Sequence, residues 1–597
     1  MLESHDRLLN EGRAGPDAST ENIVTHGTLR GRDLIGPMVL AGFFVAAVLL
    51  VPPRGEFPIN DEWDYVATVA DLLHYGEIRL SDWPAMTLVA QILWGGLFAK
   101  LFGLSYMTVR LSVISLAFVG ALALYGWARA IDRTRAESLF LGLLYATSPL
   151  VFSLSYSFMT DVPGASMMLV GLLVQAHCAR RGGVPLHLLA GVVASLGYLV
   201  RQTAALPALV LAASFLPALL RRQARAADFL ALTAPLALTV VWHGFWLDQI
   251  HGRPYQAAVG RFQFFPPETV LALLLLQLLV VGIYLAPLLL SLVGRRARAE
   301  VWRSNAPRLI VATVLLGVLL VTRRLDVGLP APYTQYVNDF YLGFETLEST
   351  TLRAPPLQVG PLSVDVFSIG ILTTIGLVSL SLGAGLLFVG LRSRWTCWRR
   401  GKGGRLPLSP GDQAGVCGLA LMGLLLVQSY PFDRYLVPII PVLAMFLLSL
   451  MPRGQGLLRS PLSWGLLALF AAFSVAGTQD YFARGRVRWQ AVDYLLQSGV
   501  KPEDISAGFE HAALYCFSPH YRGPVRVRPY LLDLPEVELR ARLETENPSL
   551  VWMQPKEYEV RYDPVVGAAP LAVFPYRSWI RAGTVLVYRW PERARRN

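Results

Sequence analysis

Charge is scarce in this 597-residue chain: charged residues make up 16% of it, whereas a soluble domain carries about 25%. Hydrophobic residues make up 54%. This balance argues against a soluble multidomain enzyme. The 27 Phe, 23 Tyr and 14 Trp exclude an intrinsically disordered chain. The composition therefore favours a polytopic membrane protein.

Cysteine and lysine are also rare. The four cysteines are far apart and show no metal-binding spacing, which argues against a disulfide framework or a zinc ribbon: Cys178, Cys397, Cys417 and Cys516. Only four lysines occur, so the net charge of +12 is almost entirely arginine. We interpret that charge as a topology signal, because the arginines gather in short loops, and we expect no nucleic-acid partner.

Thirteen apolar runs are candidates for crossing a membrane, since about 20 mostly apolar residues span its hydrocarbon core. They are 35–51, 107–128, 138–154, 164–179, 184–200, 204–220, 229–247, 269–293, 308–322, 366–391, 414–429, 435–450 and 461–478. A further apolar stretch, 86–103, contains Gln91 and Lys100 and predicts an interfacial or re-entrant helix.

The loop charges predict an orientation. The loops that follow even-numbered spans hold about twice as many basic residues as the loops that follow odd-numbered spans. Because cytoplasmic loops are the ones enriched in Lys and Arg, this predicts that the N-terminus is in the cytoplasm and the C-terminus is outside. The chain then divides into a cytoplasmic tail (1–34), a transmembrane domain (35–478) with outer loops 52–106 and 323–365, and an outer domain (479–597). A polybasic lipid-binding surface is the weaker interpretation of the arginines.

The outer C-terminal region is predicted to be a small soluble α/β domain. Residues 487–500 and 534–546 have helical spacing. Strands are expected in four short apolar stretches: ISAGFE (505–510), SLVWMQ (549–554), PLAVFPY (570–576) and TVLVYRW (584–590).

Acids and arginines recur where helices end on the predicted outer face. They are Asp61, Glu62 and Asp64 after the first span, Asp161 after the third, Arg201 after the fifth, Arg323 and Arg324 after the ninth, and Asp433 and Arg434 after the eleventh. Arginine binds phosphate bidentately, and a carboxylate deprotonates an acceptor or holds a divalent cation. The set predicts lipid-phosphate-dependent group transfer. Structural alternatives remain open: a solvated loop or a helix cap at Asp61 and Glu62, a helix cap at Thr160 or Asp161, and arginines anchored at the interface.

Three short motifs in this order resemble family 39 glycosyltransferases of the GT-C fold, which include protein O-mannosyltransferases and the lipid A aminoarabinose transferase. Asp61, Glu62 and Tyr65 resemble the D-E-x-x-Y loop motif. Thr160, Asp161 and Pro163 resemble the second acidic motif, and Arg434, Tyr435 and Pro438 resemble the late R-Y-x-x-P motif. The passage 101–125, with Gly103 and Arg110, is also similar to that family.

The resemblance implies an all-α GT-C-like membrane bundle and an inverting transfer from a polyprenyl-phosphate sugar to a lipid, glycan or protein acceptor. It makes Asp61 the principal catalytic carboxylate, Glu62 its support and Asp161 the second acid. Arg201 and Arg434 would neutralise the donor phosphate, and Tyr65, Tyr435 and Arg324 would contact substrate. The sequence identifies no definite cofactor, and a divalent metal ion is compatible with the acids. His251 and Glu77 lie in outer loops, where they could meet such a cation or be plain surface residues.

Two other functional classes stay open. A transporter or flippase for a lipid-linked sugar would use a similar membrane bundle, although transporters concentrate polar residues at mid-membrane in related halves. A non-catalytic envelope assembly protein would leave Asp61 and Asp161 dispensable. The long loop 323–363 is expected either to cover the site as a lid or to pack on the C-terminal domain. The expected location is the inner membrane of a bacterium.

Overall fold

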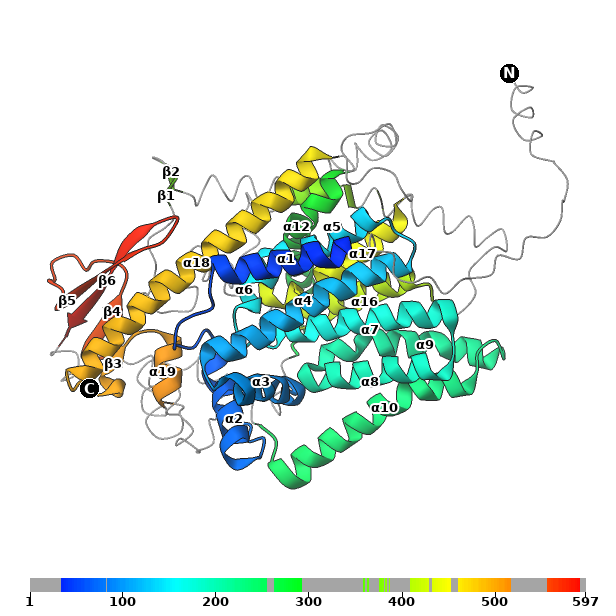
Figure 1. Cartoon of the computed structure of the whole chain (residues 1–597), viewed down its shortest axis with the longest axis horizontal. Coiled ribbons are helices and arrows are strands. Elements are labelled where there is room, and N and C mark those ends of the chain that lie inside the picture. Colours follow the sequence, from blue (N-terminus) through cyan, green and yellow to red (C-terminus); the bar gives the residue numbers. More distant parts are fainter. Residues whose placement is uncertain are drawn as a thin grey trace, which may run out of the picture.

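The computed structural model describes residues 34–81, 83–254, 262–291, 408–428, 432–451, 460–516 and 556–590, with short pieces between 358 and 386 (Figure 1). Within them, seven helices are long and apolar enough to cross a membrane, or eight if one bent pair counts as a single span. Three more apolar helices are shorter. The prediction of a helical membrane bundle with a small C-terminal sheet is confirmed.

The bundle helices follow most of the predicted spans closely. They are α1 (Ile35–Leu50), α4 (Tyr106–Ala130), α5 (Arg135–Thr147), α6 (Pro149–Ser155), α7 (Asp161–Arg181), α8 (Val184–Val200), α9 (Leu206–Leu220), α10 (Ala226–Phe245), α12 (Pro267–Leu289), α16 (Pro410–Leu425), α17 (Ile439–Leu450) and α18 (Pro461–Gln497). The expected span 308–322 lies outside the described residues, and only short helical pieces of 366–391 are described.

One predicted span is broken. The run 138–154 forms α5 and α6, which meet at Ser148 with a bend of 61°. Pro149 opens α6, and a proline there cannot continue the hydrogen-bond ladder of α5. The bend matters for function because α6 leads directly into the segment that carries Asp161.

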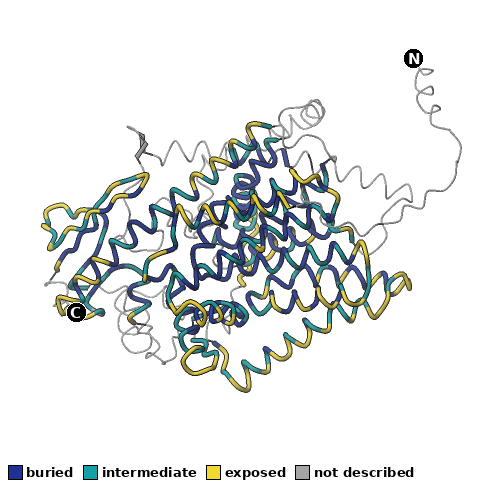
Figure 2. Tube along the Cα trace, viewed as in Figure 1, coloured by how far each residue is buried: buried dark blue, intermediate teal, exposed yellow. Residues whose placement is uncertain are grey.

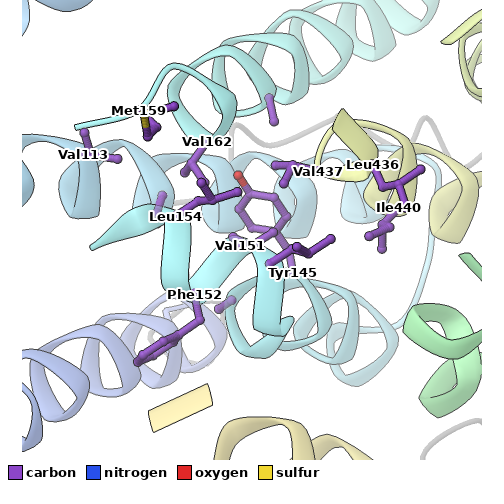
Figure 3. Packing of buried hydrophobic residues seen from close by; sticks show 14 of the residues in the cluster. Val113, Tyr145, Val151, Phe152, Leu154, Met159, Val162, Leu436, Val437 and Ile440 are labelled. Atoms are coloured by element: carbon purple, nitrogen blue, oxygen red, sulfur yellow. The ribbon is translucent and has the colours of Figure 1, made fainter. Parts of the chain in front are cut away.

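The interior of the bundle is tightly packed, whereas α10 exposes much of its surface (Figure 2). Tyr145 lies among Val151, Leu154 and Val162 (Figure 3) and its hydroxyl lies 3.1 Å from Ser166 Oγ. Gly120 of α4 faces Ser166 of α7 so closely that an added Cβ would lie 2.5 Å from its Oγ. Small residues of this kind let membrane helices approach each other.

Two short helices follow α1 at one end of the bundle: α2 (Glu62–Tyr75) and α3 (Val89–Phe102). The prediction of a short helix at 86–103 agrees with α3. Gln91 of α3 donates its amide N–H to the Phe158 carbonyl at 2.7 Å. This buried contact fixes α3 to the segment between α6 and α7.

The C-terminal region places a four-stranded sheet, in the order β3–β4–β6–β5, against the far end of α18 (Figure 1). Its strands are β3 (Ile505–Ser506), β4 (Tyr558–Arg561), β5 (Ala572–Arg577) and β6 (Ala582–Arg589). The pairing of β3 with β4 is parallel and the other two pairings are antiparallel.

Two details differ from the sequence-based expectations. The last span and the first helix of the C-terminal region form one continuous helix, α18, so no helix end marks the proposed domain boundary at residue 478. The expected strand 505–510 is extended only at Ile505–Ser506, because Phe509 already begins helix α19 (Phe509–Cys516). The stretches 534–546 and 549–554 lie outside the described residues.

Candidate active site

The predicted acids and the arginine-rich loops lie at opposite ends of the bundle. The α4–α5 and α7–α8 connections meet through Arg180, whose Nη2 lies 2.9 Å from Asp132 Oδ1. Arg133, at the same end, donates to the Met451 carbonyl at the end of α17. Asp61 directly precedes α2 and Asp161 begins α7, and the starts of these two helices lie at the other end of the bundle (Figure 1).

Asp61 is the residue before the first turn of α2, but its side chain makes no capping hydrogen bond. Instead, Oδ1 accepts a hydrogen bond from the indole N–H of Trp83 at 3.1 Å. Its Oδ2 lies 3.5 Å from Nη1 of Arg434, which comes from the segment before α17. The capping alternative is therefore wrong for Asp61, whose carboxylate contacts a distant loop and a distant helix start.

Asp161 opens α7 and is almost completely buried. Its Oδ1 accepts a hydrogen bond from Nη1 of Arg201 at 2.8 Å, and Thr160 Oγ1 accepts from the same nitrogen at 3.0 Å. Neither Thr160 nor Asp161 caps the helix with its side chain. The second carboxylate oxygen of Asp161 has no hydrogen-bond partner among the described residues.

Tyr435 joins these two acid–arginine pairs. The guanidinium carbon of Arg201 lies 5.0 Å from the centre of the Tyr435 ring, and that of Arg434 lies 5.6 Å from it. Both distances are within the range of cation–π attraction. The structure therefore brings together five predicted site residues in one continuous series of contacts: Asp61, Arg434, Tyr435, Arg201 and Asp161.

Arg434 retains hydrogen-bonding capacity although it is largely buried. Its Nε and Nη1 have no hydrogen-bond acceptor among the described residues, since the 3.5 Å contact with Asp61 is an ion pair without hydrogen-bond geometry. A buried guanidinium with free donors is a strong attractor for an anion. Together with Arg201, it is suited to hold a phosphate group at the end of the bundle.

Glu62, which the sequence predicts to support Asp61, does not lie in this series of contacts. Its carboxylate is fully buried and accepts from Nη2 of Arg110 on α4 at 2.6 Å. It also accepts the backbone N–H of Phe158 at 2.6 Å and of Ile59 at 2.9 Å. Burial raises the pKa of Glu62, and these donors oppose that rise. The contacts of Glu62 thus join the Asp61 loop to α4 and to the segment that precedes α7.

Asp64 and Tyr65 lie beside Asp61 on α2 and are buried. Burial raises the pKa of Asp64 to about 7, with a hydrogen bond from Ser81 opposing the rise and the Asp61 charge adding to it. Tyr65 donates to Met86 Sδ at 3.2 Å. Burial also raises the Tyr65 pKa far above its usual range, so its hydroxyl keeps its proton.

The remaining predicted residues either lie outside the described part of the chain or make contacts away from this series. Arg324 and the loop around it lie outside the described residues. Glu77 is exposed and paired with Arg79, and His251 Nε2 accepts the Leu80 N–H at 2.8 Å. In the described part of the chain, no group of three or more His, Cys, Asp or Glu side chains is arranged to hold a metal ion.

Trp83 is the main site residue that sequence reasoning missed. It lies in the loop between α2 and α3, and no residue spacing indicates that its indole reaches Asp61. The partnership of Glu62 with Arg110 was also missed, although both residues belong to passages that resemble the family. A charged residue inside an apolar span, such as Arg110, is itself the signal that a buried partner exists.

Residues 88–246 match the family model described as dolichyl-phosphate-mannose-protein mannosyltransferase. The resemblance to family 39 glycosyltransferases is confirmed. The matched segment contains α3 to α10 and therefore includes Asp161 and Arg201 of the site. None of the curated proteins matches the sequence.

Three solved structures show a weak similarity over most of this chain. ArnT from Cupriavidus metallidurans bound to undecaprenyl phosphate has 14% identity and a TM-score of 0.40, over 93% of this chain and 98% of that one. Archaeal oligosaccharyltransferase AglB from Archaeoglobus fulgidus has 11% identity and a TM-score of 0.41, over 89% and 70%. Arabinosyltransferase EmbB from Mycobacterium smegmatis has 16% identity and a TM-score of 0.33, over 82% and 45%. These similarities are weak, and no site residue is transferred from those proteins to this chain.

Proposed function

We propose that this protein is a membrane glycosyltransferase that moves a sugar from a polyprenyl-phosphate donor to an acceptor hydroxyl or amine, with inversion at the anomeric carbon. The observation that carries the proposal is the series Asp61–Arg434–Tyr435–Arg201–Asp161. In this series, each of two carboxylates is paired with one of two arginines. The family whose model matches residues 88–246 is described by a dolichyl-phosphate sugar, which supports the donor class.

The chemistry follows from the charges. The acceptor oxygen or nitrogen forms a bond to the anomeric carbon while the bond from that carbon to the phosphate oxygen breaks. Asp61 takes the proton of the acceptor, and the polyprenyl phosphate leaves with the bonding electrons. Arg434 and Arg201 stabilise the negative charge on that leaving phosphate, and such stabilisation is usually the largest catalytic contribution. Asp161 positions Arg201 and uses its free oxygen to orient the acceptor.

We propose that the reaction occurs on the outer face of a bacterial inner membrane, with the N-terminus in the cytoplasm. The separation of charge supports this orientation, since the arginine-rich connections lie at the end of the bundle opposite to the site. A cysteine introduced in place of Glu77, which is exposed in the loop after α2, is expected to react with an impermeant thiol reagent added to intact spheroplasts. Labelling only after the membrane is opened would reverse the orientation.

The catalytic role is tested by complementation. Mass spectrometry of envelope glycans, lipids and proteins from a strain lacking the gene identifies the missing sugar. We expect the wild-type gene to restore that sugar and Asp61→Asn to fail, although the variant protein accumulates normally in the membrane. Asp132→Asn is the matched control, because Asp132 is also ion-paired but lies at the opposite end. Full restoration by Asp61→Asn would refute the catalytic role and favour transport or assembly.

Phosphate recognition is tested separately with purified protein and radiolabelled undecaprenyl phosphate. Arg434→Ala removes the buried guanidinium that pairs with Asp61, and we expect the affinity for the lipid to fall at least tenfold. Arg180→Ala, which removes a surface arginine from the other end, is expected to bind as the wild type does. Equal affinities for all three proteins would exclude Arg434 from the phosphate site.

A further inference from the structure

The C-terminal domain reaches the proposed catalytic loop through helix α19, which lies beside α2 (Figure 1). Glu510 of α19 connects two parts of the molecule. Its Oε1 accepts the backbone N–H of Asn60 at 3.4 Å, and its Oε2 lies 3.2 Å from Nη2 of Arg488 on α18. Both side chains of the ion pair are largely buried, so α18 holds Glu510 in place against the loop.

The residue that Glu510 contacts has an unusual backbone. Asn60 has φ of 55°, in the left-handed region, and it immediately precedes Asp61. Asparagine adopts this conformation more readily than most residues, but it still needs support from its surroundings. A hydrogen bond to the Asn60 N–H from a side chain that is itself ion-paired supplies that support. It thereby determines the direction in which the chain enters Asp61.

A second contact from α19 reaches the Asp61 side chain itself. The centre of the Phe509 ring lies 5.7 Å from that of Trp83. The Trp83 ring in turn lies 5.7 Å from the ring of Trp63, which belongs to α2. Ala513 of α19 is fully buried in the same cluster. Trp83 then donates its indole N–H to Asp61 Oδ1 at 3.1 Å. The packing of α19 therefore limits the positions that this donor can take.

We propose that α19 of the C-terminal domain positions Asp61 for catalysis, with Glu510 holding the Asn60 backbone and Phe509 holding Trp83, whose N–H orients the Asp61 carboxylate. This inference rests on the proposed function. It makes Glu510, Phe509 and Trp83 positioning residues, because each acts through Asp61. It also gives the C-terminal domain a role in the reaction rate besides covering the bundle.

The test uses the full-length protein and a synthetic polyprenyl phosphate bearing the sugar identified in the deletion strain. Trp83→Phe keeps an aromatic ring but removes the donor to Asp61, and Glu510→Ala removes the acceptor for Asn60. We expect each to lower kcat by roughly 10-fold to 100-fold, the effect of a small displacement of a reacting group. The donor KM is expected to stay within a factor of about two, because the phosphate-binding arginines are not touched.

Conservative and control variants separate positioning from general damage. Glu510→Gln retains an oxygen acceptor for the Asn60 N–H, so its kcat is expected to lie between those of the wild type and Glu510→Ala. Glu557→Ala, which breaks a different ion pair of the same domain, and Trp579→Phe, which changes an exposed tryptophan there, are expected to leave kcat unchanged. Hydrogen–deuterium exchange in Glu510→Ala should accelerate at the backbone of residues 58–62 but not in α4.

The outcomes are distinguishable from those of the complementation test. If Asp61→Asn is inactive while Trp83→Phe and Glu510→Ala keep wild-type kcat, α19 does not position Asp61 and only this inference is overturned. A fall in kcat that merely follows an equal loss of folded protein, or that appears equally in the two control variants, overturns it as well. Activity in Asp61→Asn would instead overturn the proposed function.

Discussion

The buried carboxylate of Glu62 offers a sharp test of how this site is built. Glu62→Gln keeps the size of the side chain but removes its charge. The glutamate accepts two hydrogen bonds from Arg110, at 3.1 and 2.6 Å, and one each from the backbone N–H groups of Phe158 and Ile59. A neutral amide has one oxygen and one NH₂ group, so at least one of these donors loses its acceptor and Arg110 loses its counter-charge.

The size of the effect follows from the burial of both partners. Both side chains are fully inaccessible, and breaking a buried ion pair by removing one partner costs about 3–5 kcal/mol. We therefore expect Glu62→Gln to lower the melting temperature of the purified protein well below that of Asp61→Asn. Arg110→Met should cost less in the Glu62→Gln background than in the wild type, because the charge it would leave unpaired is already gone.

The measurement is tryptophan fluorescence during heating in one detergent, with sugar transfer measured below the melting temperature. A Glu62→Gln protein as stable as the wild type but inactive would refute this reasoning. It would return Glu62 to the role of a catalytic partner for Asp61.

The remaining predictions concern Asp64 and Gly164. Because burial raises the folded-state pKa of Asp64 to about 7 from the usual 3.8, the folded state alone holds the proton between these values. Stability therefore falls as the pH rises through this window, by about 1.4 kcal/mol per pH unit from this group, and is constant above it. Asp64→Asn should melt higher than the wild type at pH 8 but not near pH 4, and identical melting curves at pH 8 would contradict the raised pKa of this buried carboxyl. A Cβ on Gly164 would lie 3.2 Å from Cβ of Arg201. Gly164→Ala should displace Arg201 and lower sugar transfer several-fold, whereas Gly42→Ala, where nothing lies within 4 Å, should not. Equal activity of the two alanine variants would show that Arg201 tolerates displacement.

Much of the fold could be predicted from the sequence, because the sequence signals of a membrane span are local. An apolar run flanked by charge indicates a span whatever it packs against, and α1, α4, α7 and α8 begin and end close to the predicted residues. The break between α5 and α6 was missed, although Pro149 stands at the bend. The strand predicted at 505–510 is extended only at its first two residues, and the helix α19 that follows was not predicted, because six residues carry too little periodicity to separate a strand from a helix.

The candidate site was accessible only in part. The assignment of each loop to one side of the membrane was enough to predict that four residues share one end of the bundle: Asp61, Asp161, Arg201 and Arg434. It did not predict which acid pairs with which arginine. It also did not distinguish Asp61 from Glu62, its neighbour in the chain, although one faces Arg434 and the other is fully buried against Arg110.

The amino-acid sequence by itself determined that this chain is a helical membrane protein with acids and arginines where its helices end. Hydropathy and loop charge act residue by residue, so they need no knowledge of distant partners. Only the tertiary structure decided that Tyr435 joins the two acid–arginine pairs, and that Glu510 meets Asn60 across 450 residues of chain. Contacts of this kind depend on how helices pack against one another, and packing is a property of the whole bundle rather than of any segment.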